Sequence, residues 1–216
     1  LMGWVLYLLA QKKSVEHSSA YPERVVTAEN VASEIFSGLD IQAHSFVVFD
    51  VTHDALIYEK KAFAPRPLAS LTKIMTALVA LDAGVSDTPI TISKEAVAQS
   101  GDNGLVVGEV WALEELVEYM LITSSNDAAY QIAEHFGGEE TFTHRMNEYA
   151  ERMGLGTIVF RNASGLDLPD RIPSAFGSAY DVTRLSQFAF STYPEVFVAS
   201  ATHNVAYRSE EHTSEL

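Results

Sequence analysis

Apolar residues recur at helical spacing in several parts of the chain, above all in its middle. The stretch "LASLTKIMTALVA" (residues 68–80) has this pattern, as does nearly all of the segment from Ala112 to Gly154. The pattern predicts helices over residues 27–39, 68–80, 112–122, 126–136, 139–154 and 178–193. Two glycines at 137–138 and Gly154 fit the ends of helices, because glycine readily adopts the left-handed conformation found there.

Strand candidates are fewer and shorter than the predicted helices. Residues 44–51 and 56–60 predict a hairpin, and residues 157–160 predict one further short strand. Residues 161–177 predict a long loop. A sheet made only of a hairpin and one short strand would have poorly covered edges. We therefore expect an α+β domain whose sheet is incompletely supplied by this chain.

The two ends of the chain differ from its middle. Residues 1–13 are apolar for about ten positions and then basic, which is shorter than the roughly 20 apolar residues of a membrane span. We interpret them as the remnant of a signal peptide or signal anchor, and so as a candidate membrane anchor; a buried or amphipathic terminal helix is the alternative. Residues 14–26 predict a linker.

The last nine residues, 208–216, read "RSEEHTSEL". A common sequencing adapter encodes the same nine residues in frame, so we interpret this tail as read-through artefact rather than as a natural acidic tail. With the linker ending at residue 26, residues 27–207 are then expected to form one partial domain.

Composition and charge exclude several classes of protein. The chain has 216 residues, of which 47% are hydrophobic and 10% aromatic, so it can bury a substantial core. Its net charge of -15 and pI of about 4.7 argue against a nucleic-acid groove or a patch for anionic membranes. Its lack of cysteine excludes disulfides, thiolate zinc sites and a cysteine nucleophile.

The predicted helix over 68–80 carries one charged side chain, Lys73, three residues after Ser70. The helical neighbours of this lysine are all small: Ala69, Ser70, Thr76, Ala77 and Ala80. The opposite side carries the large apolar residues Leu71, Ile74, Met75, Leu78 and Leu81. We expect the large side to be buried and Lys73 to lie in a tight, partly buried slot beside Ser70.

That pair has a chemical use. A serine becomes a good nucleophile once a base takes its proton, and a lysine removed from water has a lowered pKa that suits it for this role. The proline-rich loop before Ser70 predicts that this serine lies in the first helical turn, where backbone N–H groups favour a developing oxyanion. By itself the S-x-x-K pair also fits a helix cap with a snorkelling lysine.

A second motif, "TSSNDAAY", places Ser124, Ser125 and Asn126 between two predicted helices. Ser125 or Asn126 could cap the helix that follows. Capping is compatible with catalysis here, since a loop between helices can present Ser124 and Asn126 to a cleft.

These segments resemble the D-alanyl-D-alanine carboxypeptidases, the low-molecular-weight penicillin-binding serine peptidases of the bacterial wall. "SLTKIMTALVAL" looks like their S-x-x-K segment and "LITSSNDAA" like their S-x-N segment. "FTHRMNEYAERMGLGTIVFRNASGLD" and "SAYDVTRLSQFAF" extend the resemblance over roughly residues 27–200. It implies a β-lactamase or penicillin-binding transpeptidase-like fold, with a helical subdomain and an incomplete antiparallel sheet, and an extracytoplasmic location.

The resemblance also implies roles for individual residues. Ser70 would be the acylated nucleophile, Lys73 its base, Ser124 a proton relay to the leaving amine, and Asn126 a hydrogen-bonding partner of the substrate's peptide group. The implied reaction removes the terminal D-alanine of a peptidoglycan stem peptide. β-Lactams would inhibit it at Ser70, and no metal or organic cofactor is expected.

The chain departs from the family at a third motif, K-[ST]-G, because no lysine follows Lys94. The strand carrying that motif should also supply an oxyanion donor, so we expect little turnover from this chain. A D,D-endopeptidase, a class A β-lactamase-like hydrolase and a non-catalytic penicillin-recognising sensor are the alternatives. The loop "RNASGLDLPDR" has no glutamate to activate a deacylating water, which favours the peptidase over the β-lactamase.

Overall fold

The computed structural model describes residues 36, 38–84, 89–101, 104–199 and 201. The chain divides into two compact units, Leu1–Asp40 and Ile41–Leu216, and nearly all of the described residues lie in the second. Several predicted segments lie wholly or almost wholly outside the described residues: the signal remnant at 1–13, the linker at 14–26, the helix at 27–39 and the tail at 208–216.

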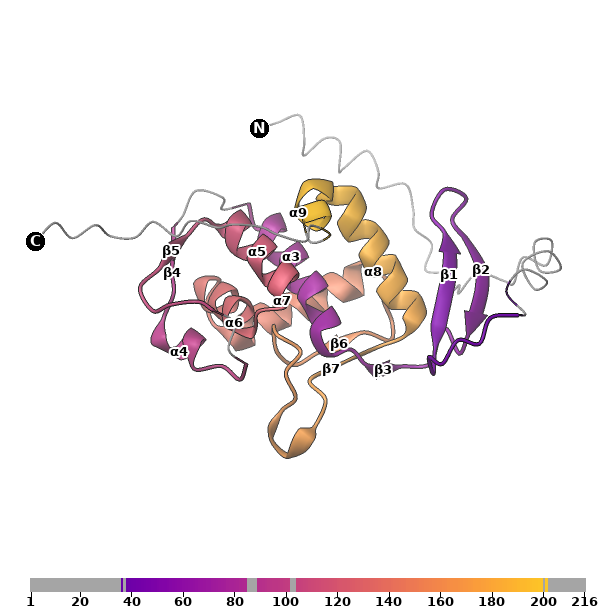
Figure 1. Cartoon of the computed structure of the whole chain (residues 1–216), viewed down its shortest axis with the longest axis horizontal. Coiled ribbons are helices and arrows are strands. Elements are labelled where there is room, and N and C mark those ends of the chain that lie inside the picture. The colour runs from indigo at the N-terminus through magenta and orange to yellow at the C-terminus, as the bar shows by residue number, and fades with distance from the viewer. Residues whose placement is uncertain (1–35, 37, 85–88, 102–103, 200, 202–216) are drawn as a thin grey trace, which may run out of the picture. The chain divides into compact units, whose positions relative to one another are not determined.

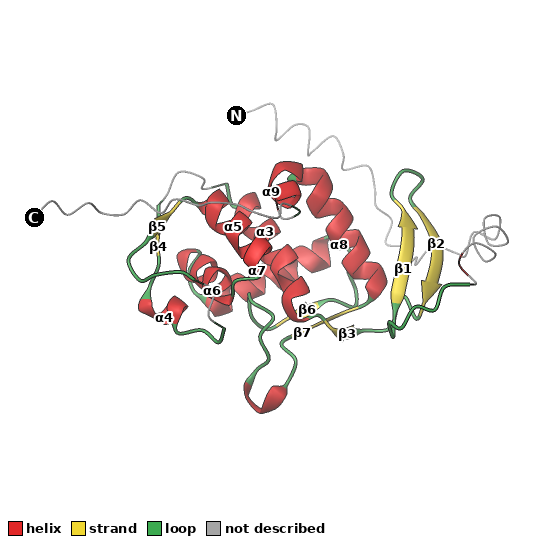
Figure 2. Ribbon diagram, in the orientation of Figure 1, coloured by secondary structure: helices red, strands yellow, loops and turns green. Residues whose placement is uncertain are grey.

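Helices are the main regular structure in the described residues of the second unit (Figures 1 and 2). They are η1 (Ala69–Leu71), α3 (Thr72–Asp82), α4 (Lys94–Val97), α5 (Leu113–Thr123), α6 (Asn126–His135), α7 (Glu139–Arg152), η2 (Pro169–Arg171), α8 (Ala179–Thr192) and α9 (Pro194–Ala199). The predicted helices over 112–122, 126–136, 139–154 and 178–193 are confirmed as α5, α6, α7 and α8. The helix predicted over 68–80 is also confirmed, although it opens with a 3₁₀ turn.

The strands are short and form three antiparallel sheets among the described residues. They are β1 (Phe46–Asp50), β2 (Ala55–Lys60), β3 (Arg66–Pro67), β4 (Ile90–Thr91), β5 (Val110–Trp111), β6 (Val159–Phe160) and β7 (Ala175–Gly177). β1 pairs with β2, β4 with β5, and β7 lies between β3 and β6.

The predicted hairpin is therefore confirmed, but the expectation of only one further strand is wrong. β3, β4 and β5 have two residues each, too few to show an alternating pattern in the sequence. The predicted long loop over 161–177 contains η2 and β7, and only the second half of the strand predicted over 157–160 is extended as β6.

The core is centred on α3, which packs against α5, α6, α7 and α8. Met75, Ala77, Leu78 and Ala80 have no exposed surface. A helix with neighbours on several sides has no solvated face, so its small residues are buried as well as its large ones. The expectation that the whole large apolar side is buried is wrong at Leu71, which is 48% exposed because it belongs to η1, ahead of this packing, and Ile74 and Leu81 are only partly buried.

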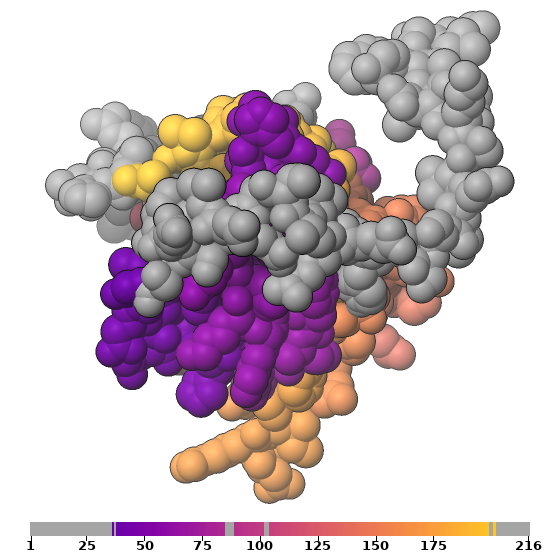
Figure 3. All heavy atoms as spheres, turned by 90° about the vertical axis from the view of Figure 1, so that its right-hand side faces the viewer, coloured from indigo at the N-terminus to yellow at the C-terminus, as the bar shows by residue number. Residues whose placement is uncertain are grey.

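The β1–β2 hairpin contacts α8, and Figure 3 shows the face of the molecule that it forms. The ring of Tyr180 on α8 lies 6.2 Å from Phe49 and 5.0 Å from Phe63, centroid to centroid. Arg184, one turn further along α8, stacks 5.5 Å from the centre of the Phe49 ring and forms an ion pair with Asp54 in the hairpin turn. Aromatic and cation–π contacts therefore hold the hairpin to α8.

Within the part of the chain that the structure describes, no helix is both long and apolar enough to cross a bilayer. The candidate anchor at residues 1–13 lies outside that part.

Candidate active site

Ser70 is the middle residue of η1, the 3₁₀ turn that leads directly into α3, so the prediction that it occupies the first helical turn is confirmed. The chain reaches it from β3 by way of Leu68, whose N–H donates to the carbonyl of Ala175 at 3.0 Å. Ala69 then takes a left-handed conformation, with φ of 47°. A non-glycine residue in this region is strained, and such strain commonly lies at functional sites.

Lys73 is buried, with 2% of its surface exposed, in the slot that its small neighbours predict. Its Nζ lies 3.3 Å from Ser70 Oγ, 2.8 Å from Asn126 Oδ1 and 2.7 Å from the carbonyl oxygen of Ser164. Three segments far apart in the sequence therefore meet at one nitrogen: the start of α3, the start of α6 and the loop after β6.

Burial lowers the pKa of Lys73 from its ordinary value of 10.5 to about 8. A neutral amine has two N–H groups and one lone pair. The carbonyl of Ser164 and the amide oxygen of Asn126 can only accept hydrogen bonds, so they take the two N–H groups. The lone pair is then directed toward the third partner, the hydroxyl of Ser70, as proton abstraction requires.

Asn126 is fixed at both ends of its amide. While Oδ1 accepts from Lys73, Nδ2 donates to the carbonyl of Ser100 at 2.8 Å. The residue is the first of α6, and Ser125 caps that helix by accepting from the backbone N–H of Ala128. One N–H of the Asn126 amide remains for a further acceptor.

Ser124 lies at the same junction of α5 and α6, where it ends α5 in a left-handed conformation with φ of 57°. The residue is exposed. In the described part of the chain, its hydroxyl forms no hydrogen bond with Ser70 or Lys73. The structure thus brings Ser70, Lys73 and Asn126 together, whereas Ser124, two residues before Asn126, is joined to neither Ser70 nor Lys73 by a hydrogen bond among the described residues.

The turn over residues 162–166 was not predicted as part of the site. Besides the contact of Ser164 with Lys73, the carbonyl of Ala163 accepts from Thr76 Oγ1 at 2.6 Å. Gly165 has φ of 81°, and a Cβ there would lie 1.9 Å from the carbonyl oxygen of Ala69. The sequence "NASG" is typical of a turn, but nothing in its composition shows which helix the turn contacts.

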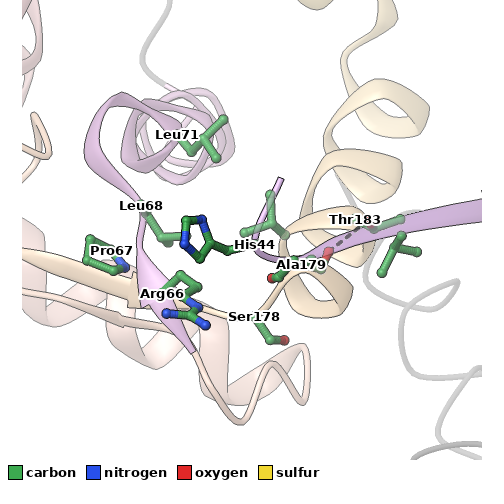
Figure 4. A pocket seen from close by; sticks show the side chains of 12 residues that line it. His44, Arg66, Pro67, Leu68, Leu71, Ser178, Ala179 and Thr183 are labelled. Carbon is green, nitrogen blue, oxygen red and sulfur yellow. Dashed lines mark hydrogen bonds between the residues drawn. The ribbon is translucent and has the colours of Figure 1, made fainter. Parts of the chain in front are cut away.

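A cavity of about 480 Å³ lies near the site, bounded by β1, β3, η1 and the start of α8 (Figure 4). Leu68 and Leu71 line it, together with polar groups that include His44 and Arg66. Ser70, Lys73, Ser124 and Asn126 are not among its lining residues. Among the described residues, no group of three histidine or acidic side chains could hold a metal ion.

A serine beside a buried lysine, with an asparagine from a facing helix, is typical of serine–lysine acyl-transfer enzymes. Residues 28–215 match the D-alanyl-D-alanine carboxypeptidase family, and the chain belongs to this family.

The relatives carry two kinds of name. D-alanyl-D-alanine carboxypeptidase DacD of Escherichia coli is 31% identical over 173 residues, which are 73% of this chain and 43% of that protein. A D-alanyl-D-alanine endopeptidase of Pseudomonas aeruginosa is 29% identical over 199 residues, 88% of this chain and 62% of that protein. The chain therefore spans less than half the length of the E. coli relative.

A solved structure of the same kind is penicillin-binding protein D2 of Listeria monocytogenes, determined in its ampicillin-bound form. It superposes with a TM-score of 0.64 at 30% identity, covering 77% of this chain and 69% of that one. The fold is thus that of the penicillin-binding proteins, as the resemblance implied.

Proposed function

We propose that this chain carries the acylating centre of a serine-type D-Ala-D-Ala carboxypeptidase. The observation that carries the proposal is the position of Lys73, buried and 3.3 Å from Ser70 Oγ, with two fixed acceptors for its N–H groups. Removal of the terminal D-alanine of a peptidoglycan stem peptide is the reaction that fits both this geometry and the family.

In the proposed reaction, Ser70 Oγ attacks the carbonyl carbon before the terminal D-alanine while Lys73 Nζ takes its proton. The tetrahedral intermediate then collapses and the C–N bond breaks, while the proton held by Lys73 Nζ passes through Ser124 to the leaving amine. Water then attacks the ester on Ser70, which releases the shortened peptide and restores the serine hydroxyl. Asn126 keeps Lys73 in place and offers its remaining N–H to the substrate's peptide group.

The proposed substrate lies outside the cytoplasm, so we infer an extracytoplasmic location, with anchoring through residues 1–13 as part of the same proposal. β-Lactams are proposed as inhibitors that acylate Ser70. Support comes from the Listeria monocytogenes relative, whose structure holds ampicillin.

A second candidate, cleavage of cross-links by a D,D-endopeptidase, is supported by the P. aeruginosa relative, which covers 88% of this chain. Both activities use the same acyl-enzyme chemistry. The two candidates differ in what leaves: free D-alanine in the first, and the amine of a second stem peptide in the second.

Labelling with a fluorescent penicillin tests the acylation step. We expect slow, stable labelling of the chain, because it has no K-[ST]-G motif, and we expect the adduct at Ser70 by peptide mass spectrometry. Equal labelling of Ser70→Ala, or an adduct at another residue, would contradict the proposal. Incubation with a pentapeptide and with a cross-linked dimer then separates the two candidates by the product released.

A further inference from the structure

We propose that Asn162 is a positioning residue for the catalytic base. Its carboxamide closes the turn over residues 162–166, and this turn presents the carbonyl of Ser164 to Lys73 Nζ. The catalytic meaning of this proposal rests on the proposed function. The predicted effect of Asn162 on the titration of Lys73 does not depend on that function.

The turn is closed mainly by the Asn162 side chain. Asn162 Oδ1 accepts from the N–H of Gly165 at 2.8 Å, and Asn162 Nδ2 donates to the carbonyl of Leu166 at 2.7 Å. The hydroxyl of Ser164 adds a third bond by accepting from the N–H of Leu166 at 3.2 Å. Asn162 and Ser164 are 7% and 5% exposed, so water does not compete freely for these bonds.

The closed turn contacts η1 and α3 at three points. Thr76 Oγ1 donates to the carbonyl of Ala163 at 2.6 Å, and Lys73 Nζ donates to the next carbonyl, that of Ser164, at 2.7 Å. Gly165 lies so close to Ala69 that any side chain would overlap its carbonyl. Two consecutive carbonyls are thus aimed at α3, and their direction depends on the bonds that Asn162 makes.

The groups facing Lys73 are a hydroxyl (Ser70), an amide (Asn126) and a backbone carbonyl (Ser164). None of them carries a charge, and within the described residues burial alone shifts the pKa of Lys73. A hydrogen bond to a charged group favours that charged form. If the Ser164 carbonyl turns away, the ammonium form loses an acceptor, and the midpoint of the Lys73 titration falls.

Asn147 provides a matched control in the same region. Its amide also clamps backbone, since Nδ2 donates to the carbonyl of Phe160 at 2.8 Å and Oδ1 accepts from the N–H of Phe160 at 2.9 Å. The clamp lies just before the 162–166 turn, but within the described residues Phe160 is not among the hydrogen-bond partners of Lys73. Asn147→Ala should therefore destabilise the fold without changing the titration of the lysine.

The experiment is an NMR titration of the full chain with ¹³C-labelled lysine. The sequence has six lysines, so the Lys73 signal is assigned as the one missing from Lys73→Arg. We expect Asn162→Ala to lower the Lys73 midpoint by about one pH unit, the size expected for one lost hydrogen bond to a charged group. We expect the midpoint in Asn147→Ala to equal that of the wild type.

An unchanged or raised midpoint in Asn162→Ala would overturn the proposal, as would an equal shift in Asn147→Ala. If Asn162→Ala does not fold, Ser164→Ala decides: it removes the third bond of the turn and should lower the midpoint by a smaller amount, and no change there overturns the proposal. The titration needs no substrate. Failure of penicillin labelling at Ser70 would thus count against the proposed function alone.

Discussion

Two parts of the region around Ser70 differ in how tightly their side chains are held. We call the polar cluster around Lys73 the helical side and the β1–β2 hairpin the hairpin side. Around Lys73, segments from α3, α6 and the 162–166 turn converge on one nitrogen and hold it with bonds of 2.7 and 2.8 Å. On the other side, β1 pairs only with β2 among the described strands, and the neighbouring Leu71 is half exposed at the edge of a cavity. The Lys73 amine is thus held by buried and part-buried hydrogen bonds, whereas the polar contacts in the hairpin turn, around Asp50, are exposed.

Gly165→Ala is expected to disrupt the helical side most strongly. Its new Cβ would meet the Ala69 carbonyl at 1.9 Å, and φ of 81° is strained for alanine. Because neither backbone can move freely, we expect a loss of about 3 kcal/mol in the free energy of unfolding, and loss of Ser70 labelling. Urea denaturation measures the first effect.

Gly177→Ala serves as the control for this substitution. Its Cβ would meet side-chain atoms of Ile158 and Leu68 at 2.9 and 3.1 Å, and such side chains can shift. A cost of about 1 kcal/mol is expected. Equal losses in the free energy of unfolding for the two substitutions would contradict an unusually close contact between the 162–166 turn and Ala69.

Replacing Lys73 tests the charge of its buried amine. The pKa of Lys73 is about 8 in the folded chain and 10.5 unfolded, so between these values the unfolded chain binds more protons and stability rises with pH. The wild type should gain about 2.5 kcal/mol from this group between pH 7 and pH 10. Lys73→Met should lack that gain in urea denaturation at the two pH values, and parallel pH dependence in both proteins would argue against a buried ammonium group.

The smallest effect is expected on the hairpin side. Arg184→Ala removes the stacking on Phe49 and the exposed ion pair with Asp54, which should cost about 1 kcal/mol. The Lys73 titration should be unchanged, because among the described residues the partners of Arg184 are Phe49 and Asp54, and neither is hydrogen-bonded to Lys73. A shifted midpoint in this variant would mean that the two sides are coupled and would contradict the contrast between them.

The sequence predicts the helices and the lysine slot because both depend on periodicity. Small residues at positions 69, 76, 77 and 80 predict where Lys73 lies, and the structure buries it there. The two-residue strands are too short for a periodic signal, so pairings such as β3 with β7 become visible only in the folded chain.

The 162–166 turn was missed for a different reason. Its bonds join a side chain to backbone three and four residues away, and its contacts with α3 span 87 and 91 residues. A turn-forming composition predicts the first kind of contact but not the second. The exposure of Leu71 likewise depends on a 3₁₀ turn that apolar spacing does not distinguish from an α-helix.

The central claim is that Lys73, as a neutral amine, takes the proton of Ser70. It is tested most directly by the rate of Ser70 acylation by fluorescent penicillin as a function of pH. The acylation rate should rise with pH to a plateau, with a midpoint near 8, the pKa of Lys73. In Lys73→Arg this rate should be lower by about 10²-fold or more. A rate independent of pH between 6 and 10, or one retained in Lys73→Arg, would contradict the claim.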